Sequence, residues 1–97
     1  MTPADSMRLV WIANSIPTMR ARIDALLAKK AEIEEGIEHN GLVIQDQAAF
    51  PNLVAHMHRL GDGLRALQGG YPDDIEIATA MARYEDAYET LALVVAP

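Results

Sequence analysis

Apolar residues recur along this chain at alternating spacings of three and four residues, the period of an α-helix that buries one face. One run consists of Ile16, Met19, Ile23, Leu26, Lys30, Ile33 and Ile37. A second run consists of Phe50, Leu53, Met57, Leu60, Leu64 and Leu67. A third run consists of Ile77, Met81, Tyr84, Tyr88, Leu91 and Val95. The shared period predicts long helices that pack along their length, as in a helical bundle.

The first residues predict a further helix ahead of these runs. Thr2 suits the N-cap of a helix, and Pro3 suits its first position. The inner face of this helix is predicted to carry Met7, Val10 and Trp11. Pro17 would cost about 3 kcal/mol inside a helix, so we expect the helix to end before it. Ser15 is then the expected cap of the next helix.

The remaining boundaries come from residues that begin or end helices. Asn40-Gly41 predicts one helix end and Gly69-Gly70 another. Leu42-Val43-Ile44 is the one β-like run, and it predicts an extended connector or an edge that pairs across a dimer. Pro51 suits the first turn of the next helix, and Asp73-Asp74 suits the acidic start of the last. We therefore expect one all-α domain over residues 1–97, a small bundle of about four helices at 3–14, 16–39, 51–68 and 73–95.

Three residues interrupt the apolar runs. Lys30 occupies a core-type position, so we expect its stem to be buried while its ammonium reaches solvent or a carboxylate. Gly61 and Gly63 each cost up to about 1 kcal/mol relative to alanine inside a helix. They are expected either to bend the helix or to allow another segment to approach it closely.

Length and composition limit what such a bundle can be. The chain has 97 residues, of which 51% are hydrophobic and 23% charged, and this is a globular composition. The absence of cysteine excludes disulfides, thiolate metal sites and cysteine nucleophiles. No apolar run approaches the roughly 18–20 residues that span a bilayer, and the first residues lack a signal-peptide pattern. We therefore expect a cytoplasmic protein with no membrane association.

The core of so short a chain is small compared with the entropy lost when the chain is ordered. A long helix with an apolar seam often completes its packing against a second copy. We therefore expect the chain to be its own partner, as a homo-oligomer.

Charge is unevenly distributed along the chain, whose net charge is −6. Residues 1–30 carry five basic and two acidic side chains, whereas residues 31–97 carry three basic and twelve acidic ones. This balance disfavours nucleic acid as a partner without excluding it. Two acidic clusters are the candidate partner-binding residues: Glu34, Glu35 and Glu38, and Glu85, Asp86 and Glu89. They predict a contact surface for a basic protein, and the alternative is a solvated face without a partner.

Residue types that carry catalysis or bind metals form no recognisable pattern in the sequence. Ser6 and Ser15 lack a nucleophile elbow, and the sequence has no phosphate-binding glycine loop. His56 and His58 are two residues apart, so they point to different faces of a helix. His58 and Asp62 have i,i+4 spacing and could share a hydrogen bond or a weak metal site. We expect no enzyme activity, no catalytic residue, no metal and no cofactor.

Several short motifs resemble those of phage terminase small subunits. They are Thr2-Pro3-Ala4-Asp5 at a helix start, His39-Asn40-Gly41-Leu42-Val43-Ile44 after a helical stretch, and Pro51-Asn52 before a helix that ends near Leu67. Motifs of this length are a hypothesis about family rather than a fingerprint. The resemblance implies a ring-forming assembly that recognises packaging-site DNA and regulates the large-subunit motor.

Three functions follow from the sequence. The leading prediction is a non-enzymatic protein–protein interaction module, an oligomeric adaptor or assembly factor, with a phage-related role as one reading. The second is an acidic inhibitor that covers a basic nucleic-acid-binding surface of a target protein. The third, which the resemblance implies, is a terminase-like DNA-packaging protein.

Overall fold

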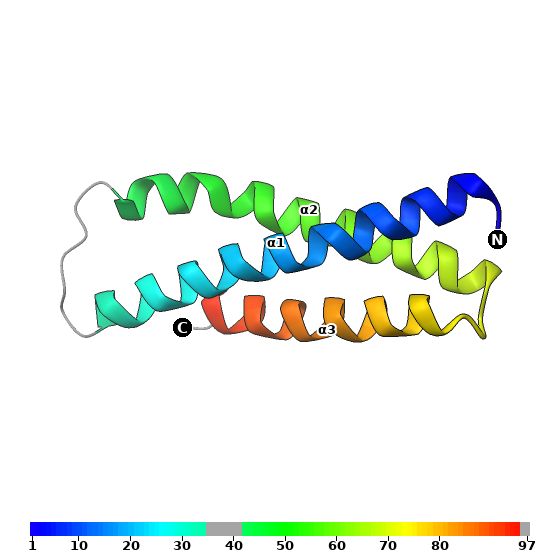
Figure 1. Cartoon of the computed structure of the whole chain (residues 1–97). Helices are drawn as coiled ribbons and strands as arrows, with labels where there is room; N and C mark the ends of the chain where they lie inside the picture. The colour runs from blue at the N-terminus through cyan, green and yellow to red at the C-terminus, as the bar shows by residue number, and fades with distance from the viewer. Residues whose placement is uncertain (35–41, 96–97) are drawn as a thin grey trace.

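The computed structural model describes the backbone of residues 1–34 and 42–95, and the side chains of residues 1–32 and 50–94. Three helices follow one another in this part of the chain: α1 (Pro3–Glu34), α2 (Leu42–Gly70) and α3 (Ile75–Val95). α1 and α3 run in the same direction and α2 runs back in the opposite one (Figure 1). The all-α prediction is confirmed for the described residues, whereas the prediction of four helices is wrong, because three are present there.

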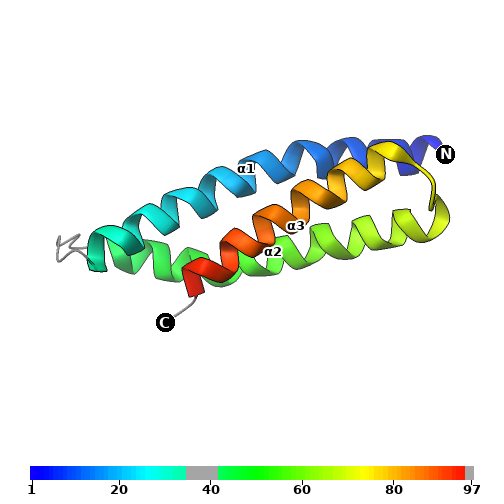
Figure 2. The same cartoon turned by 90° about the horizontal axis from the view of Figure 1, so that it is seen from below.

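The helices form an elongated bundle with extents of 50 × 18 × 17 Å. Each helix packs against both of the others, and the three lie alongside one another over most of their length (Figure 2). One shared core follows, built from aliphatic side chains and methionines of all three helices together with Tyr84 of α3. None of the helices described is both long and apolar enough to cross a membrane.

α1 starts as predicted but does not end at Pro17. The backbone amide of Asp5 donates a hydrogen bond of 3.1 Å to Thr2 Oγ1, which confirms Thr2 as the N-cap. The helix then continues through Pro17 to Glu34, so the predicted break is wrong. Pro17 is exposed, and water can therefore reach the backbone that it leaves unpaired. Ser15 is not a cap, because its hydroxyl donates to the Trp11 carbonyl oxygen at 2.8 Å within the helix.

The inner face of the first turns also differs from the prediction. The exposed fractions of Met7, Val10 and Trp11 are 74%, 59% and 55%. The buried side chains are instead Leu9 and Ile12. These two extend the run that starts at Ile16 backwards with the same spacing of three and four. Because the helix is continuous across Pro17, the face that is buried after Pro17 also sets the buried face before it. The prediction of a separate first helix missed this shared register.

α2 begins earlier than predicted. Leu42–Ile44 is helical, so the predicted connector or edge strand is wrong there, and Pro51 lies well inside the helix rather than in its first turn. The first turn of a helix pairs the carbonyl groups of this apolar triplet with amides further along α2, whereas a three-residue strand would need a neighbour. From Phe50 onward the predicted run is confirmed. Phe50 packs against the core, and five members are buried: Leu53, Met57, Leu60, Leu64 and Leu67.

Gly61 and Gly63 of α2 mark close approaches of the other helices. A Cβ atom at Gly61 would lie 2.6 Å from Cζ of Tyr84 on α3. A Cβ atom at Gly63 would lie 3.0 Å from Cδ1 of Ile12 on α1. Of the two predicted roles, close approach is thus confirmed, and the missing side chains make room for both neighbours of α2.

α3 has a capped start and an alternating buried face. Asp74 precedes the helix, and its Oδ1 accepts hydrogen bonds from the amides of Glu76 at 2.9 Å and Ile77 at 3.1 Å. The acidic start is therefore confirmed, with the first helical residue at Ile75. The buried side chains of the helix are Ile77, Ala80, Tyr84, Ala87, Thr90 and Leu91. Tyr88 was predicted in the seam but lies at its edge, with an exposed fraction of 40%.

Two cations of α1 bind α3. The Arg20 guanidinium donates to Asp24 within α1 at 3.0 Å and also pairs with Asp86 of α3. The Lys30 ammonium donates to the backbone carbonyl of Leu93 at 2.8 Å. The ammonium was expected to reach solvent or a carboxylate, and its partner here is a backbone carbonyl in the last turns of α3, where the helix dipole favours a cation.

Candidate partner-binding site

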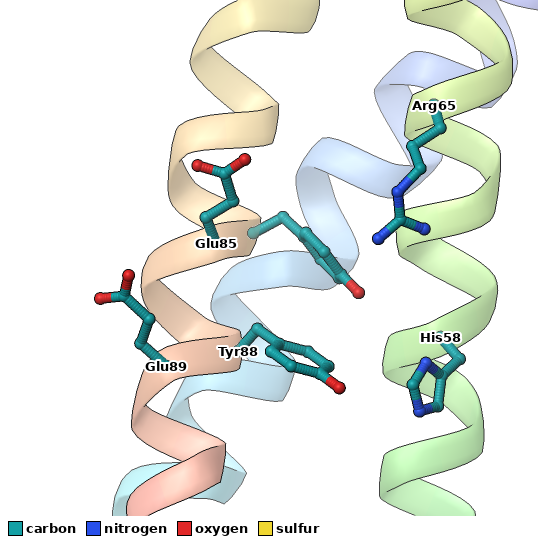
Figure 3. A pocket seen from close by; sticks show the side chains of 6 residues that line it. His58, Arg65, Glu85, Tyr88 and Glu89 are labelled. Atoms are coloured by element: carbon teal, nitrogen blue, oxygen red, sulfur yellow. The ribbon is translucent and has the colours of Figure 1, made fainter.

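A cleft of about 350 Å³ lies between α2 and α3. His58 and Arg65 line it from α2, and four residues line it from α3: Tyr84, Glu85, Tyr88 and Glu89. Figure 3 shows Tyr88 reaching from α3 towards His58, with Glu85 and Glu89 at the outer edge of α3. We refer to these six residues as the α2–α3 cleft.

Helical spacing explains why the sequence gathers these side chains. His58 and Arg65 are seven residues, or about two turns, apart, so they share one face of α2. Glu85, Tyr88 and Glu89 stand at i, i+3 and i+4, which places them on one face of α3. Two faces brought together by the packing of α2 on α3 therefore make one mixed surface.

The aromatic part of the cleft is held in place from both sides. The ring of Tyr88 lies 5.9 Å from the ring of Tyr84 and 5.9 Å from that of His58, and the His58 contact is edge-on at 65°. Tyr84 is buried, and this burial raises the pKa of its hydroxyl above the ordinary value of 10.0. Tyr88 is thus an aromatic side chain with little freedom, a type that is enriched where proteins bind one another.

Among the charged residues of the cleft, Arg65 forms an ion pair in the described part of the chain and the two glutamates do not. Arg65 pairs with Asp62 on its own helix at 3.2 Å. Glu85 and Glu89 are exposed, and neither forms an ion pair within the part of the chain that the structure describes. The two carboxylates lie one turn apart at the outer edge of α3, whereas the ring of Tyr88 points towards α2 (Figure 3). A basic segment that enters the cleft can therefore meet the anions at its outer edge and the aromatic ring between the two helices.

The structure divides the one predicted acidic cluster whose side chains it describes. Glu85 and Glu89 come together at the cleft, but Asp86 does not line it and pairs with Arg20 of α1 instead. Glu34 is the last residue of α1, and its side chain lies outside the described part. Glu35 and Glu38 lie outside the described residues altogether. Of the three predicted partner-binding residues whose side chains are described, two therefore share one surface.

The sequence did not point to four residues of the cleft: His58, Arg65, Tyr84 and Tyr88. His58 was expected to be solvated or to bind Asp62. It is exposed and its ring contacts Tyr88, while Asp62 pairs with Arg65. Tyr88 was assigned to the core. The signal available was its place between Glu85 and Glu89, because a residue flanked by carboxylates on its own face seldom lies deep in a core. Among the described residues, no three histidine, aspartate or glutamate side chains gather to hold a metal ion.

Compared with known proteins, the chain matches no family model, no curated protein and no solved structure. Its function therefore has to be inferred from the side chains of the cleft and from their surroundings.

Proposed function

We propose that the chain is a non-enzymatic protein–protein interaction module, an oligomeric adaptor or assembly factor, whose α2–α3 cleft binds a basic segment of a partner protein. One observation carries the proposal: Glu85 and Glu89, exposed and without an ion pair in the described part, line the same cleft as the half-exposed ring of Tyr88. Such an arrangement has the composition of an interface hot spot, with an aromatic anchor and a charged rim.

The two kinds of residue have different tasks in this proposal. A cation over the ring of Tyr88 is worth about 0.5–2 kcal/mol, depending on how far it is desolvated. Each exposed ion pair with Glu85 or Glu89 adds only about 0–1 kcal/mol, but the pair of charges attracts a basic partner over distance. The carboxylates should therefore control the rate of association, and the ring the lifetime of the complex.

The test uses a fluorescent synthetic peptide rich in arginine and lysine, mixed with the whole chain in a stopped-flow instrument at low and high salt. Glu89→Lys is expected to slow association about fivefold to tenfold at low salt, and the difference should shrink at high salt. Asp73→Lys is the matched control, because it changes the net charge equally at an exposed turn outside the cleft. It should slow association by less than about twofold.

Equal effects of Glu89→Lys and Asp73→Lys would show that only overall charge attracts the peptide, and the proposed site would then be wrong. Duplex DNA serves as a second probe. Salt-sensitive binding of DNA that survives Glu89→Lys would instead favour the terminase-like function.

A further inference from the structure

A second hollow of about 420 Å³ lies between the amino-terminal halves of α1 and α3, on the side of α3 that does not face α2. Its lining is mainly apolar, with Val10 and Ile16 from α1 and Ile75 and Ala80 from α3. Ile75 has an exposed fraction of 79%, and Val10 is more than half exposed. We refer to this hollow as the α1–α3 groove. Its exposed apolar side chains are the kind of surface that proteins cover with a partner.

Two opposite charges, Glu76 and Arg83, also line the groove. Both belong to α3 and are exposed, and within the described residues neither forms an ion pair. They are seven residues apart, so they share one face of the helix at a separation of about 10 Å, too far to pair with each other. The groove therefore carries one anion and one cation, each of which lacks a partner in the described part.

A second copy of the same chain supplies both missing charges. When two α3 helices pack antiparallel about a two-fold axis near Thr79, Glu76 of each copy lies opposite Arg83 of the other. The exposed residues around that axis are small, namely Ala78, Thr79 and Ala82, and they let two helices approach closely. The same pairing covers Ile75 and Val10 of both copies. A self-complementary patch of this kind is what a two-fold interface requires.

We propose that the α1–α3 groove is the interface of a two-fold symmetric homodimer in which Glu76 of each copy pairs with Arg83 of the other. This inference deepens the oligomeric part of the proposed function and names its surface and symmetry. The α2–α3 cleft is on another side of α3, so a dimer formed in this way presents two clefts to basic partners.

The test measures molar mass by light scattering during gel filtration of the whole chain, whose monomer has a mass of 10.6 kDa. The unchanged chain is expected to be a dimer. Glu76→Arg and Arg83→Glu each create two like-charge pairs across the axis, so each variant alone should weaken the dimer about tenfold or more. Mixing the two single variants restores every opposite pair, so the mixture should form a dimer. The double variant should do so by itself for the same reason.

Recovery of the dimer on mixing distinguishes the proposed charge pairs from a folding defect, since a misfolded variant would not form a dimer when it is mixed with the other variant. Helix content and melting temperature should stay close to those of the unchanged chain, because both positions are exposed. Ile75→Asp should also weaken the dimer, whereas an aspartate at a helix start does not harm the monomer.

The inference is overturned if the unchanged chain stays monomeric up to about 1 mM, where a specific dimer would form. It is equally overturned if the unchanged chain forms a dimer and the two single variants, alone and mixed, have the same dimer mass. Neither result affects the peptide-binding test of the cleft, which has its own outcome. Glu89→Lys, which disrupts the cleft, should leave the dimer mass unchanged.

Discussion

Gly61 lacks a side chain at the point where the Tyr84 ring crosses α2, and this single residue lets the two helices pack closely. A rigid, buried ring cannot move aside at low cost, unlike the end of a long exposed side chain. The placement of Tyr84, and through it of Tyr88 at the cleft, thus depends on a hydrogen atom in place of a methyl group at position 61.

Gly61→Ala is expected to destabilise the protein by about 1–2 kcal/mol, because the overlap with Tyr84 outweighs the better helix propensity of alanine. Gly69→Ala is the matched control. No atom lies within 4 Å of a Cβ added there, so it should stabilise the protein by about 0.5–1 kcal/mol. Urea denaturation at a fixed protein concentration measures both. Tyr84→Phe should recover part of the loss in Gly61→Ala, and equal gains from both glycine substitutions would contradict the close approach.

At the scale of the element, α1 shows how burial overrides a local helix breaker. Ile16 and Met19 on either side of Pro17 enter the same core, and a break would expose part of this stripe. Burying each such side chain is worth about 1.5–3 kcal/mol, so the whole stripe exceeds the cost of roughly 3 kcal/mol for one proline. The helix therefore tolerates Pro17 at its exposed side.

Pro17→Ala should stabilise the protein by about 2 kcal/mol, because it restores a helical hydrogen bond and removes the ring clash. Part of the gain is lost because alanine leaves the unfolded chain freer than proline does. Pro3→Ala is the control, since proline at the first position of a helix has no bond to restore. The midpoints of thermal unfolding report the change. A gain from Pro17→Ala no larger than that from Pro3→Ala would mean that α1 is broken at this residue.

At the scale of the whole molecule, polar contacts near one end of the bundle join the start of α1 to the turn before α3. The Tyr71 hydroxyl donates to Asp5 Oδ2 at 2.6 Å and accepts from the Thr2 amide at 3.3 Å. The hydrogen bond that Asp5 accepts from the Tyr71 hydroxyl lowers the pKa of Asp5 below its ordinary value of 3.8, and hydrogen bonding with the Thr2 side chain acts in the same direction. The same contact with Asp5 raises the pKa of Tyr71 above 10.0.

These directions fix the pH range in which the contact stabilises the fold. A lowered pKa in Asp5 stabilises the folded state above pH 3.8, and this contribution is lost as the pH falls through the lowered value. A raised pKa in Tyr71 stabilises it below pH 10.0, and this contribution is lost as the pH rises through the raised value. Tyr71→Phe keeps the ring against the core and should flatten both losses in a series of urea midpoints against pH. An unchanged acid limb in Tyr71→Phe would show that Asp5 owes nothing to this hydroxyl.

The amino-acid sequence by itself determined the helical periods and the capped start of α1. The run from Leu53 to Leu67, the capping by Thr2 and the acidic start at Asp73-Asp74 depend on residues within a few positions of one another, so local patterns contain them. The acidic character of α3 could likewise be read from the sequence, although only Glu85 and Glu89 of its cluster line one cleft.

The tertiary structure alone decided which of these local preferences prevailed. It carried α1 through Pro17, placed Tyr88 at the surface, and paired Asp86 with Arg20, which is 66 residues away in the sequence. Each outcome depends on which helix faces pack together, and the free energy of that packing comes from contacts between segments far apart in the chain. A pattern of spacings records the face that a helix can bury but not the neighbour that covers it, and the neighbour sets both the register of the core and the charges left without a partner.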